Sequence, residues 1–325
     1  MFQIKHYETL ETFNNERNNL EPPYIAYVEE IGTVFYYKYR VLCIKQKDIP
    51  TMTYEVVDLG LPSGTLWADR NVGATSPEDY GFYFQWGDVT PYTVDGVGEI
   101  TPAKLVELMN TIIFPKLGID IEATVDNVGT ILEQFGITGT DLINTPTVSI
   151  GYSFDKIFNW ETYNKIDQII SYDEHGNPNE FKKYSEGKLT VLEPIDDAAT
   201  VHMGSNYRTP THTEIYELID NTTQTFIDLD GNEYSKEQAQ NGVIEQFKLK
   251  GVRFTGSNGN SIFIPAANRI EIRSTYINGG WGCYHANDLF DSDSYEGFYF
   301  NYEGDVYQGL DYRYYPQSVR GVLKQ

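Results

Sequence analysis

In the first fifty residues, a hydrophobic pattern typical of a helix is followed by one typical of strands. Between residues 7 and 20, apolar side chains recur at helical spacing among polar neighbours, which predicts a short amphipathic helix. The stretches YIAYVEE and TVFYYKYRV come next, meet at Ile31-Gly32 and are rich in aromatic and β-branched residues, so they predict a β-hairpin. A helix with one hairpin is too small to be stable alone. Residues 1–50 are therefore predicted to form an N-terminal anchoring or oligomerisation module.

From Tyr54 onward, short apolar pieces alternate with Gly, Pro and Asp turns, which is typical of an irregular α+β fold with many short strands. A helical pattern interrupts this texture. Thr101 can cap a helix that has Pro102 at its first position, and an apolar stripe of helical period follows. We therefore predict one domain over residues 54–325 with a helical insertion at about 96–152. The stripe is interpreted as core rather than as an interface.

Two local signals in the second half of this domain are more specific. Thr211 and Glu214 form a capping box, which predicts a helix over TPTHTEIYELIDN. The side of this helix expected to be buried carries Ile215, Leu218 and Ile219. The segment FKLKGVRFTGSNGNSIFIPAANRI predicts a hairpin with its turn near Ser257–Gly259.

Composition and charge exclude some classes of binding partner for this protein. The 325 residues include 26 tyrosines and carry a net charge of −23. Such a charge repels nucleic acid and anionic lipid, so we expect neither as a partner. No apolar run is long enough to span a membrane, and the N-terminus lacks the pattern of a secretory signal, so we expect neither membrane insertion nor export by that route. Cys43 and Cys283 are far apart, and two buried thiols are favoured over a disulfide.

Motifs that would indicate an enzyme are missing. The five histidines form no HExxH pair, and no GxSxG elbow, P-loop or GxGxxG cradle occurs. In so acidic a chain, a pair of carboxylates that cleaves glycosides remains an open alternative. Asp288, Asp291 and Asp293 in DLFDSDSYE could offer oxygen ligands to calcium, but the spacing is not that of an EF-hand, and a solvated acidic loop is favoured. We predict a protein that is not an enzyme and has neither a metal nor a cofactor.

Five ordered motifs carry a resemblance to a known family. VDLGLPSGTLWADRNVGA, YGFYFQWGD, LEPIDDAATVHMGSNYRTPTHTEIYELI, GNSIFIPAA and QSVRGV together resemble a C-type-lectin-like domain. The branch is the major paralogous domain of gut bacteria and their phages, which is related to formylglycine-generating enzymes. The resemblance covers about residues 54–95 and 153–323. It implies an α+β, C-type-lectin-like fold whose C-terminal half presents a ligand-facing surface. WGCYHAND departs from the family pattern, which puts the local shape there in doubt.

The resemblance also bears on activity and location. Formylglycine-generating relatives need two nearby C-terminal cysteines for copper, whereas this chain has Cys283 alone in that region, so that oxidase activity is disfavoured. Residues 1–50 resemble N-terminal modules on virion proteins of phages that infect gut Bacteroidales. This likeness implies a location on the virion surface, synthesis in the host cytoplasm and release by lysis.

The segment from His285 to Pro316 is crowded with tyrosine and acids. Alternation predicts that Phe298, Phe300, Val306 and Val319 are core, and the family motif implies the same for Trp67, Trp86 and Trp281. Tyrosine offers a rigid apolar face and a hydroxyl, which suits recognition of sugars or proteins. The alternative is a tyrosine-rich shell in water or an oligomer interface. The predicted ligand-binding residues are Tyr284, His285, Asn287, Asp288, Tyr295, Asn301, Tyr302, Tyr307, Asp311, Tyr312, Tyr314 and Tyr315.

These expectations combine into one hypothesis about function. We expect a non-enzymatic virion structural protein, a phage head fibre or tail-associated protein, that displays a C-type-lectin-like surface to host or gut glycan or protein. Residues 1–50 would bind other virion proteins, and the chain would form a homo-oligomer, a dimer or trimer. The alternatives are a bacterial surface or secreted lectin-like adhesin and, third, an oxidase or hydrolase of the formylglycine-generating type.

Overall fold

The fold is taken from a computed structural model, which describes only part of the chain. The described residues are 3–16, 24–28, 33–44, 52–96, 110, 122, 124, 127, 149–154, 158–245, 248–270, 280–290 and 294–323. They divide into two compact units. The first comprises Met1–Leu42, Val94–Asp155 and Ile272–Thr275, and the second comprises Cys43–Thr93, Lys156–Glu271 and Tyr276–Gln325.

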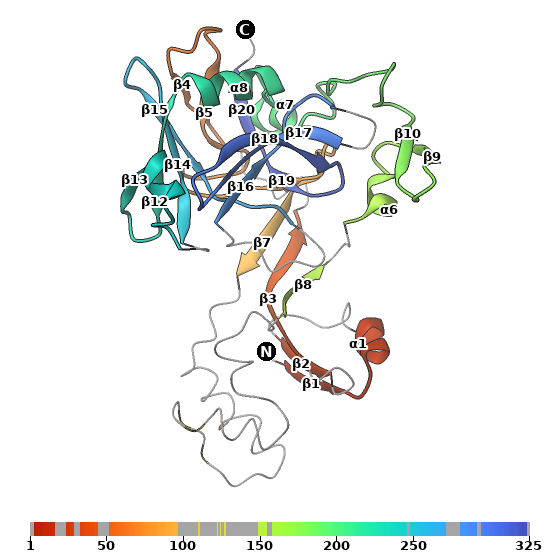
Figure 1. The fold of residues 1–325 in the computed structure, drawn as a ribbon. Coiled ribbons are helices and arrows are strands. Elements are labelled where there is room, and N and C mark those ends of the chain that lie inside the picture. Colours follow the sequence, from red (N-terminus) through yellow and green to blue (C-terminus); the bar gives the residue numbers. More distant parts are fainter. Residues whose placement is uncertain are drawn as a thin grey trace. The chain divides into compact units, whose positions relative to one another are not determined.

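The first unit contains one described helix and four strands, shown in Figure 1. These are β1 (Gln3–Tyr7), α1 (Leu10–Glu16), β2 (Tyr24–Val28), β3 (Thr33–Cys43) and β8 (Ser149–Phe154). The predicted helix and the antiparallel pairing of β2 with β3 are present. However, β1 pairs with β2 and β8 pairs with β3, both in parallel. The module is therefore a small sheet with a helix, and not a lone hairpin.

The second unit is built on a sheet that ends in the tyrosine-rich segment. Its strands lie in the order β6, β19, β16, β17, β18. They are β6 (Tyr83–Phe84), β16 (Trp281–Tyr284), β17 (Ser294–Asn301), β18 (Val306–Tyr312) and β19 (Gln317–Ser318). After β6 the chain continues into β7 (Tyr92–Gly96), which pairs with β6 in antiparallel fashion at Tyr83 and Tyr92.

Two four-stranded sheets and one strand pair complete the second unit. One sheet has the order β11 (Tyr207–Arg208), β20 (Arg320–Leu323), β5 (Leu66–Asn71), β4 (Val56–Asp58). The other has the order β13 (Glu233–Ser235), β12 (Thr223–Asp228), β14 (Leu249–Thr255), β15 (Ser261–Pro265). The pair is β9 (Ile169–Tyr172) with β10 (Pro178–Phe181). Antiparallel β14 and β15 are the predicted hairpin around Ser257–Gly259.

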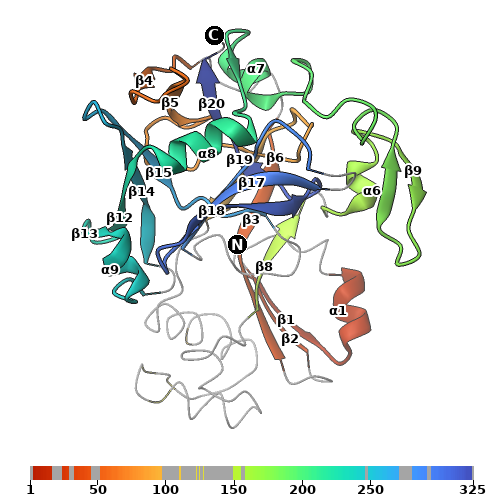
Figure 2. The ribbon, with the colours of Figure 1, turned by 45° about the horizontal axis from the view of Figure 1, so that its top comes forward.

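Helices of the second unit are short. They are α6 (Trp160–Tyr163), α7 (Ala198–Met203), α8 (His212–Asp220) and α9 (Lys236–Gln240). The predicted capping box of Thr211 and Glu214 opens α8, which buries Ile215 and Leu218 while Ile219 is partly buried. Figures 1 and 2 show α8 beside β17 and β18, which it contacts. No described helix is long and apolar enough to cross a membrane.

The predicted α+β class with a helical insertion is wrong, because the structure is mostly β-sheet. The sequence correctly predicts helix α8, but the helices of the second unit are short. The short apolar pieces between turns form strands. Most of the predicted insertion at 96–152 lies outside the described residues. At its described end, residues 149–152 belong to strand β8.

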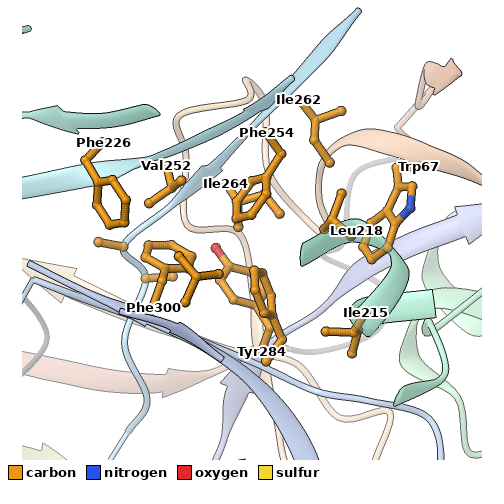
Figure 3. Packing of buried hydrophobic residues seen from close by; sticks show 14 of the residues in the cluster. Trp67, Ile215, Leu218, Phe226, Val252, Phe254, Ile262, Ile264, Tyr284 and Phe300 are labelled. Carbon is orange, nitrogen blue, oxygen red and sulfur yellow. The ribbon is translucent and has the colours of Figure 1, made fainter. Parts of the chain in front are cut away.

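The largest core of the second unit lies between β14 and β15 on one side and β16 and β17 on the other. Figure 3 shows Phe254 and Ile264 facing Tyr284 and Phe300, with Trp67 beside α8. The residues correctly predicted to be core are Phe298, Phe300, Val306, Val319, Trp67 and Trp86. Trp281 is only half-buried, so its assignment to the core is wrong. Alternation explains the difference, because Trp281 lies on the face of β16 opposite to Tyr284.

Candidate functional site

The candidate site lies on the face of β16, β17 and β18 that is turned away from this core. Cys283 of β16 pairs with Tyr299 of β17, which in turn pairs with Tyr307 of β18. Their chain neighbours Tyr284 and Phe298 belong to the core. Since successive side chains of a strand point to opposite faces, Cys283, Tyr299 and Tyr307 share the other face.

On this face the structure has an open groove of about 690 Å³. That volume falls within the range of roughly 300–1,000 Å³ that is typical of sites for small ligands. Cys283, Tyr299, Tyr307 and Gly309 line it from the three strands. Further lining residues are Asn268, Arg269, Trp281, Tyr302 and Glu303.

Two facing glycines make room for tyrosine side chains that line the groove. Gly297 of β17 is directly opposite Gly309 of β18. The Tyr299 side chain lies over Gly297, where its hydroxyl would be 2.6 Å from an added Cβ. The Tyr299 ring also stacks on the ring of Tyr307, with centroids 5.6 Å apart and an angle of 27°. A larger residue at position 297 would displace Tyr299 and change the groove floor.

Asp311 fixes two side chains that line the groove, Arg269 and Tyr299. Its Oδ2 accepts from Arg269 Nη1 at 2.6 Å, from the Tyr299 hydroxyl at 3.0 Å and from Gln317 Nε2. Burial raises the pKa of Asp311, while Arg269 and the Tyr299 hydroxyl act in the opposite direction. Burial also raises the pKa of Tyr299 well above its usual value, so this hydroxyl remains a donor at neutral pH.

Beside the groove, four aromatic side chains form a cluster that we call the aromatic patch: Trp160, Tyr312, Tyr314 and Tyr315. The rings of Tyr312 and Tyr314 are stacked at 5.4 Å and 7°, and those of Tyr314 and Tyr315 are 4.4 Å apart. Trp160 meets Tyr314 edge-on at 4.7 Å. The guanidinium of Arg269 lies 4.6 Å from the centroid of Tyr315, so Arg269 borders both the groove and the patch.

The structure divides the predicted ligand-binding residues into two sets. Six are at least partly accessible, namely Asp288, Tyr302, Tyr307, Tyr312, Tyr314 and Tyr315. The other six are buried, namely Tyr284, His285, Asn287, Tyr295, Asn301 and Asp311. Their predicted exposure is wrong, and they cannot contact a ligand on the surface directly.

Three of the buried side chains, Tyr284, His285 and Tyr295, have specific neighbours. The hydroxyl of Tyr284 donates to the carbonyl oxygen of Pro265 at 2.6 Å, so this tyrosine is part of the core. His285 donates from Nε2 to the carbonyl oxygen of Phe84 at 2.6 Å, and the ring of Tyr295 stacks on that of Trp86.

Two further buried residues, Asn287 and Asn301, connect or fix loops. Asn287 exchanges main-chain hydrogen bonds with Pro210 and Leu192. The side chain of Asn301 accepts from the backbone N–H groups of Glu303 and Asp305, and so fixes the turn between β17 and β18. These polar residues are therefore structural.

Asp288 has a structural role as well. Its Oδ1 accepts from the backbone N–H of His212 at 2.8 Å, and its Oδ2 contacts His212 Nδ1, which ties this loop to the start of α8. Asp291 and Asp293, the other two acids of the calcium hypothesis, lie outside the described residues. In the described part of the chain, no three His, Cys, Asp or Glu residues are placed to hold a metal ion. Cys283 is buried and forms no disulfide with a described residue, whereas the side chain of Cys43 is not described.

Residue-level reasoning missed several members of the site. Arg269, Trp160, Glu303 and Asn268 lie far from the tyrosines in sequence or in turns, and no periodic pattern connects them. One signal was available: Gly297 and Gly309 interrupt two aromatic strands, and such glycines mark a close approach or a space for a ligand.

Comparisons with known proteins give no relative. The chain matches no protein-family model, no curated protein and no solved structure. The resemblance to a C-type-lectin-like domain therefore stays a prediction.

Proposed function

We propose that this chain is a non-enzymatic recognition protein that is displayed on the surface of a virion and binds a glycan or protein of the host. The observation that carries the proposal is the aromatic patch. Tyr312 is 40 % exposed, and its ring stacks with Tyr314 beside Trp160 and Tyr315. Aromatic side chains that contact one another in this way offer a large contact area.

The patch is already organised for binding. Its rings contact one another and the guanidinium of Arg269, which is itself held by buried Asp311. A ligand that binds to rings in fixed positions loses less conformational entropy than one that must order them. Each tyrosine also adds a hydroxyl for hydrogen bonds.

The charge of the chain limits the ligand. At −23 it repels nucleic acid and anionic membranes. A neutral or cationic partner is compatible with it. A virion carries many copies of a surface protein, so that weak individual sites combine into firm attachment.

The first unit would attach the protein to the particle in this proposal. Its small sheet extends the predicted hairpin of β2 and β3 by the parallel strands β1 and β8. Residues 1–50 would bind other virion proteins and support self-association as a dimer or trimer.

Binding can be tested with the double variant Tyr312→Ala, Tyr314→Ala. We expect adhesion of the labelled protein to host cells to fall about ten-fold, because two accessible rings contribute on the order of 1–3 kcal/mol together. Tyr172→Ala is the matched control, since Tyr172 is 55 % exposed and lies on β9. Equal adhesion of the double variant and the control would contradict the proposal.

Mass spectrometry of purified particles tests the location. We expect peptides of this chain in the virion, at a copy number above one. If the chain were absent from particles and present in a bacterial surface fraction, the bacterial adhesin would replace the virion protein as the conclusion.

A further inference from the structure

Two aromatic residues that line the groove, Tyr307 and Trp281, each carry a polar group at the end of the ring. Tyr307 is 39 % exposed, and Trp281 is half-buried. One face of the Tyr307 ring stacks on Tyr299. Neither the Tyr307 hydroxyl nor the Trp281 N–H donates to another residue in the described part of the chain. Each combines an apolar ring with a polar donor group.

The charges around the groove disfavour an anionic ligand. Arg269 is the cation on its wall, and the ion pair with buried Asp311 balances that charge. Glu303 is exposed at the rim and accepts from the Tyr302 hydroxyl at 3.2 Å. A ligand with its own negative charge would face Glu303 and the net charge of −23.

The groove also contains a buried donor without an acceptor. Asn268 is 5 % exposed and has a left-handed backbone, with a φ of 55°. Its Oδ1 accepts from the backbone N–H of Arg269 at 2.8 Å and lies 3.8 Å from Cys283 Sγ. Its Nδ2 finds no partner among the described residues. An unpaired buried donor is costly, and a ligand oxygen beside Asn268 would supply the missing acceptor once the amide group turns toward the groove.

We infer that this groove is a binding site for a neutral pyranose sugar, as a free ring or as the terminal residue of a glycan; the inference rests on the proposed function and names its ligand class. A pyranose has an apolar C–H face and a rim of hydroxyl groups. The face can lie on Tyr307 or Trp281. The hydroxyls can accept from Asn268 and Trp281 and donate to Glu303.

Two other occupants fit less well. An amine would gain from Glu303 and the rings but would lie beside the partly exposed guanidinium of Arg269. A protein partner usually anchors one large side chain in a deep, desolvated pocket. The groove is open and carries polar groups along its walls, which suits hydroxyl groups better.

The test measures binding of small sugars to the full chain by isothermal titration and saturation-transfer NMR. The neutral probes are the methyl glycosides of glucose, galactose, mannose and N-acetylglucosamine. Glucuronate and glucosamine are the anionic and cationic probes. We expect at least one neutral glycoside to bind and both charged sugars to bind more weakly.

Variants then locate the site. Tyr307→Ala and Trp281→Ala should each weaken binding about ten-fold, which corresponds to about 1.4 kcal/mol. Asn268→Asp keeps the size and the acceptor of Asn268 but replaces the donor by a charge, and it should also weaken binding. Tyr172→Ala should bind as the unchanged protein does, and circular dichroism should confirm that each variant is folded.

Several results would overturn the inference. These are binding of none of the four neutral glycosides, tighter binding of glucosamine or glucuronate, or unchanged affinity in folded Tyr307→Ala. Adhesion to host cells that depends on Tyr312 and Tyr314 but occurs without sugar binding would overturn this inference alone. If adhesion did not depend on Tyr312 and Tyr314, the proposed function would be contradicted instead.

Discussion

Arg269 and Asp311 form an ion pair of 2.6 Å in which the carboxylate is buried and the guanidinium is partly exposed. The pair connects two parts of the site, because Asp311 also fixes the Tyr299 hydroxyl under the groove while Arg269 lies against Tyr315. Loss of the carboxylate charge would leave a cation without its partner and a groove floor without its acceptor.

Asp311→Asn should therefore destabilise the protein. We expect a loss of about 1–3 kcal/mol in the free energy of unfolding, less than for a fully buried pair because water screens Arg269. Urea unfolding measures it. The control is Glu233→Gln, which breaks the exposed pair of Glu233 with Arg253 and should cost less than about 1 kcal/mol. Equal losses in the two variants would show that the buried pair has no special role.

The facing glycines give a second prediction. Gly297→Ala places a Cβ 2.6 Å from the Tyr299 hydroxyl, whereas the closest atom to a Cβ at Gly309 is a ring carbon of Tyr307 at 3.1 Å. Overpacking of this kind costs about 1–3 kcal/mol. In urea unfolding we expect Gly297→Ala to lose most of that amount and Gly309→Ala to lose less. The reverse order would mean that Tyr299 moves aside freely.

Alternation and capping could be predicted from the sequence because they are local. Phe298 and Phe300 are two residues apart in an aromatic strand, so they share one face, and their size places it in the core. Likewise, Thr211 and Glu214 start α8 through hydrogen bonds within one turn. In both cases the partners that decide the structure are neighbours in the chain.

Burial of the polar residues could not be predicted in this way. Asp311 depends on Arg269, 42 residues earlier, and Tyr284 depends on a carbonyl of β15. A tyrosine or an aspartate is compatible with either face of a strand until such a partner is known. The same holds for β8, whose pairing with β3 joins segments more than a hundred residues apart.

His285 gives a prediction about pH. Burial lowers its pKa to about 4, against about 6.5 in an unfolded chain, and the hydrogen bond to Phe84 opposes the shift only in part. Between these values the unfolded state binds a proton that the folded state does not. The free energy of unfolding should therefore fall by about 3 kcal/mol as the pH drops from about 6.5 to about 4.

His285→Gln isolates this effect. Glutamine retains a donor for the carbonyl oxygen of Phe84 but does not titrate, so the variant should lose the part of the pH dependence that His285 causes. Urea unfolding at intervals between pH 7 and pH 4 measures the difference. His202, whose pKa burial also lowers, contributes equally to both proteins and cancels. Parallel curves for the two proteins would show that His285 does not carry the dependence.

Arg313 supports the site from inside the second unit. Its guanidinium is fully buried, lies 4.1 Å from the ring centroid of Phe181 and 5.0 Å from that of Trp86, and is 3.5 Å from Asp167. Arg313→Met fills similar space but leaves the buried carboxylate of Asp167 without its cation. We expect a loss of about 3–5 kcal/mol in urea unfolding.

A double-mutant cycle separates charge from packing in this case. When Asp167→Asn is added to Arg313→Met, no uncompensated charge remains, so the double variant should be at least about 1 kcal/mol more stable than the two single losses predict together. Arg253→Met, at a partly exposed arginine, is the control and should cost less than about 1 kcal/mol. Strict additivity of the two single losses would mean that Arg313 acts through its stacking on Phe181 and Trp86, and that Asp167 is held by the N–H groups of Lys183 and Tyr184 alone.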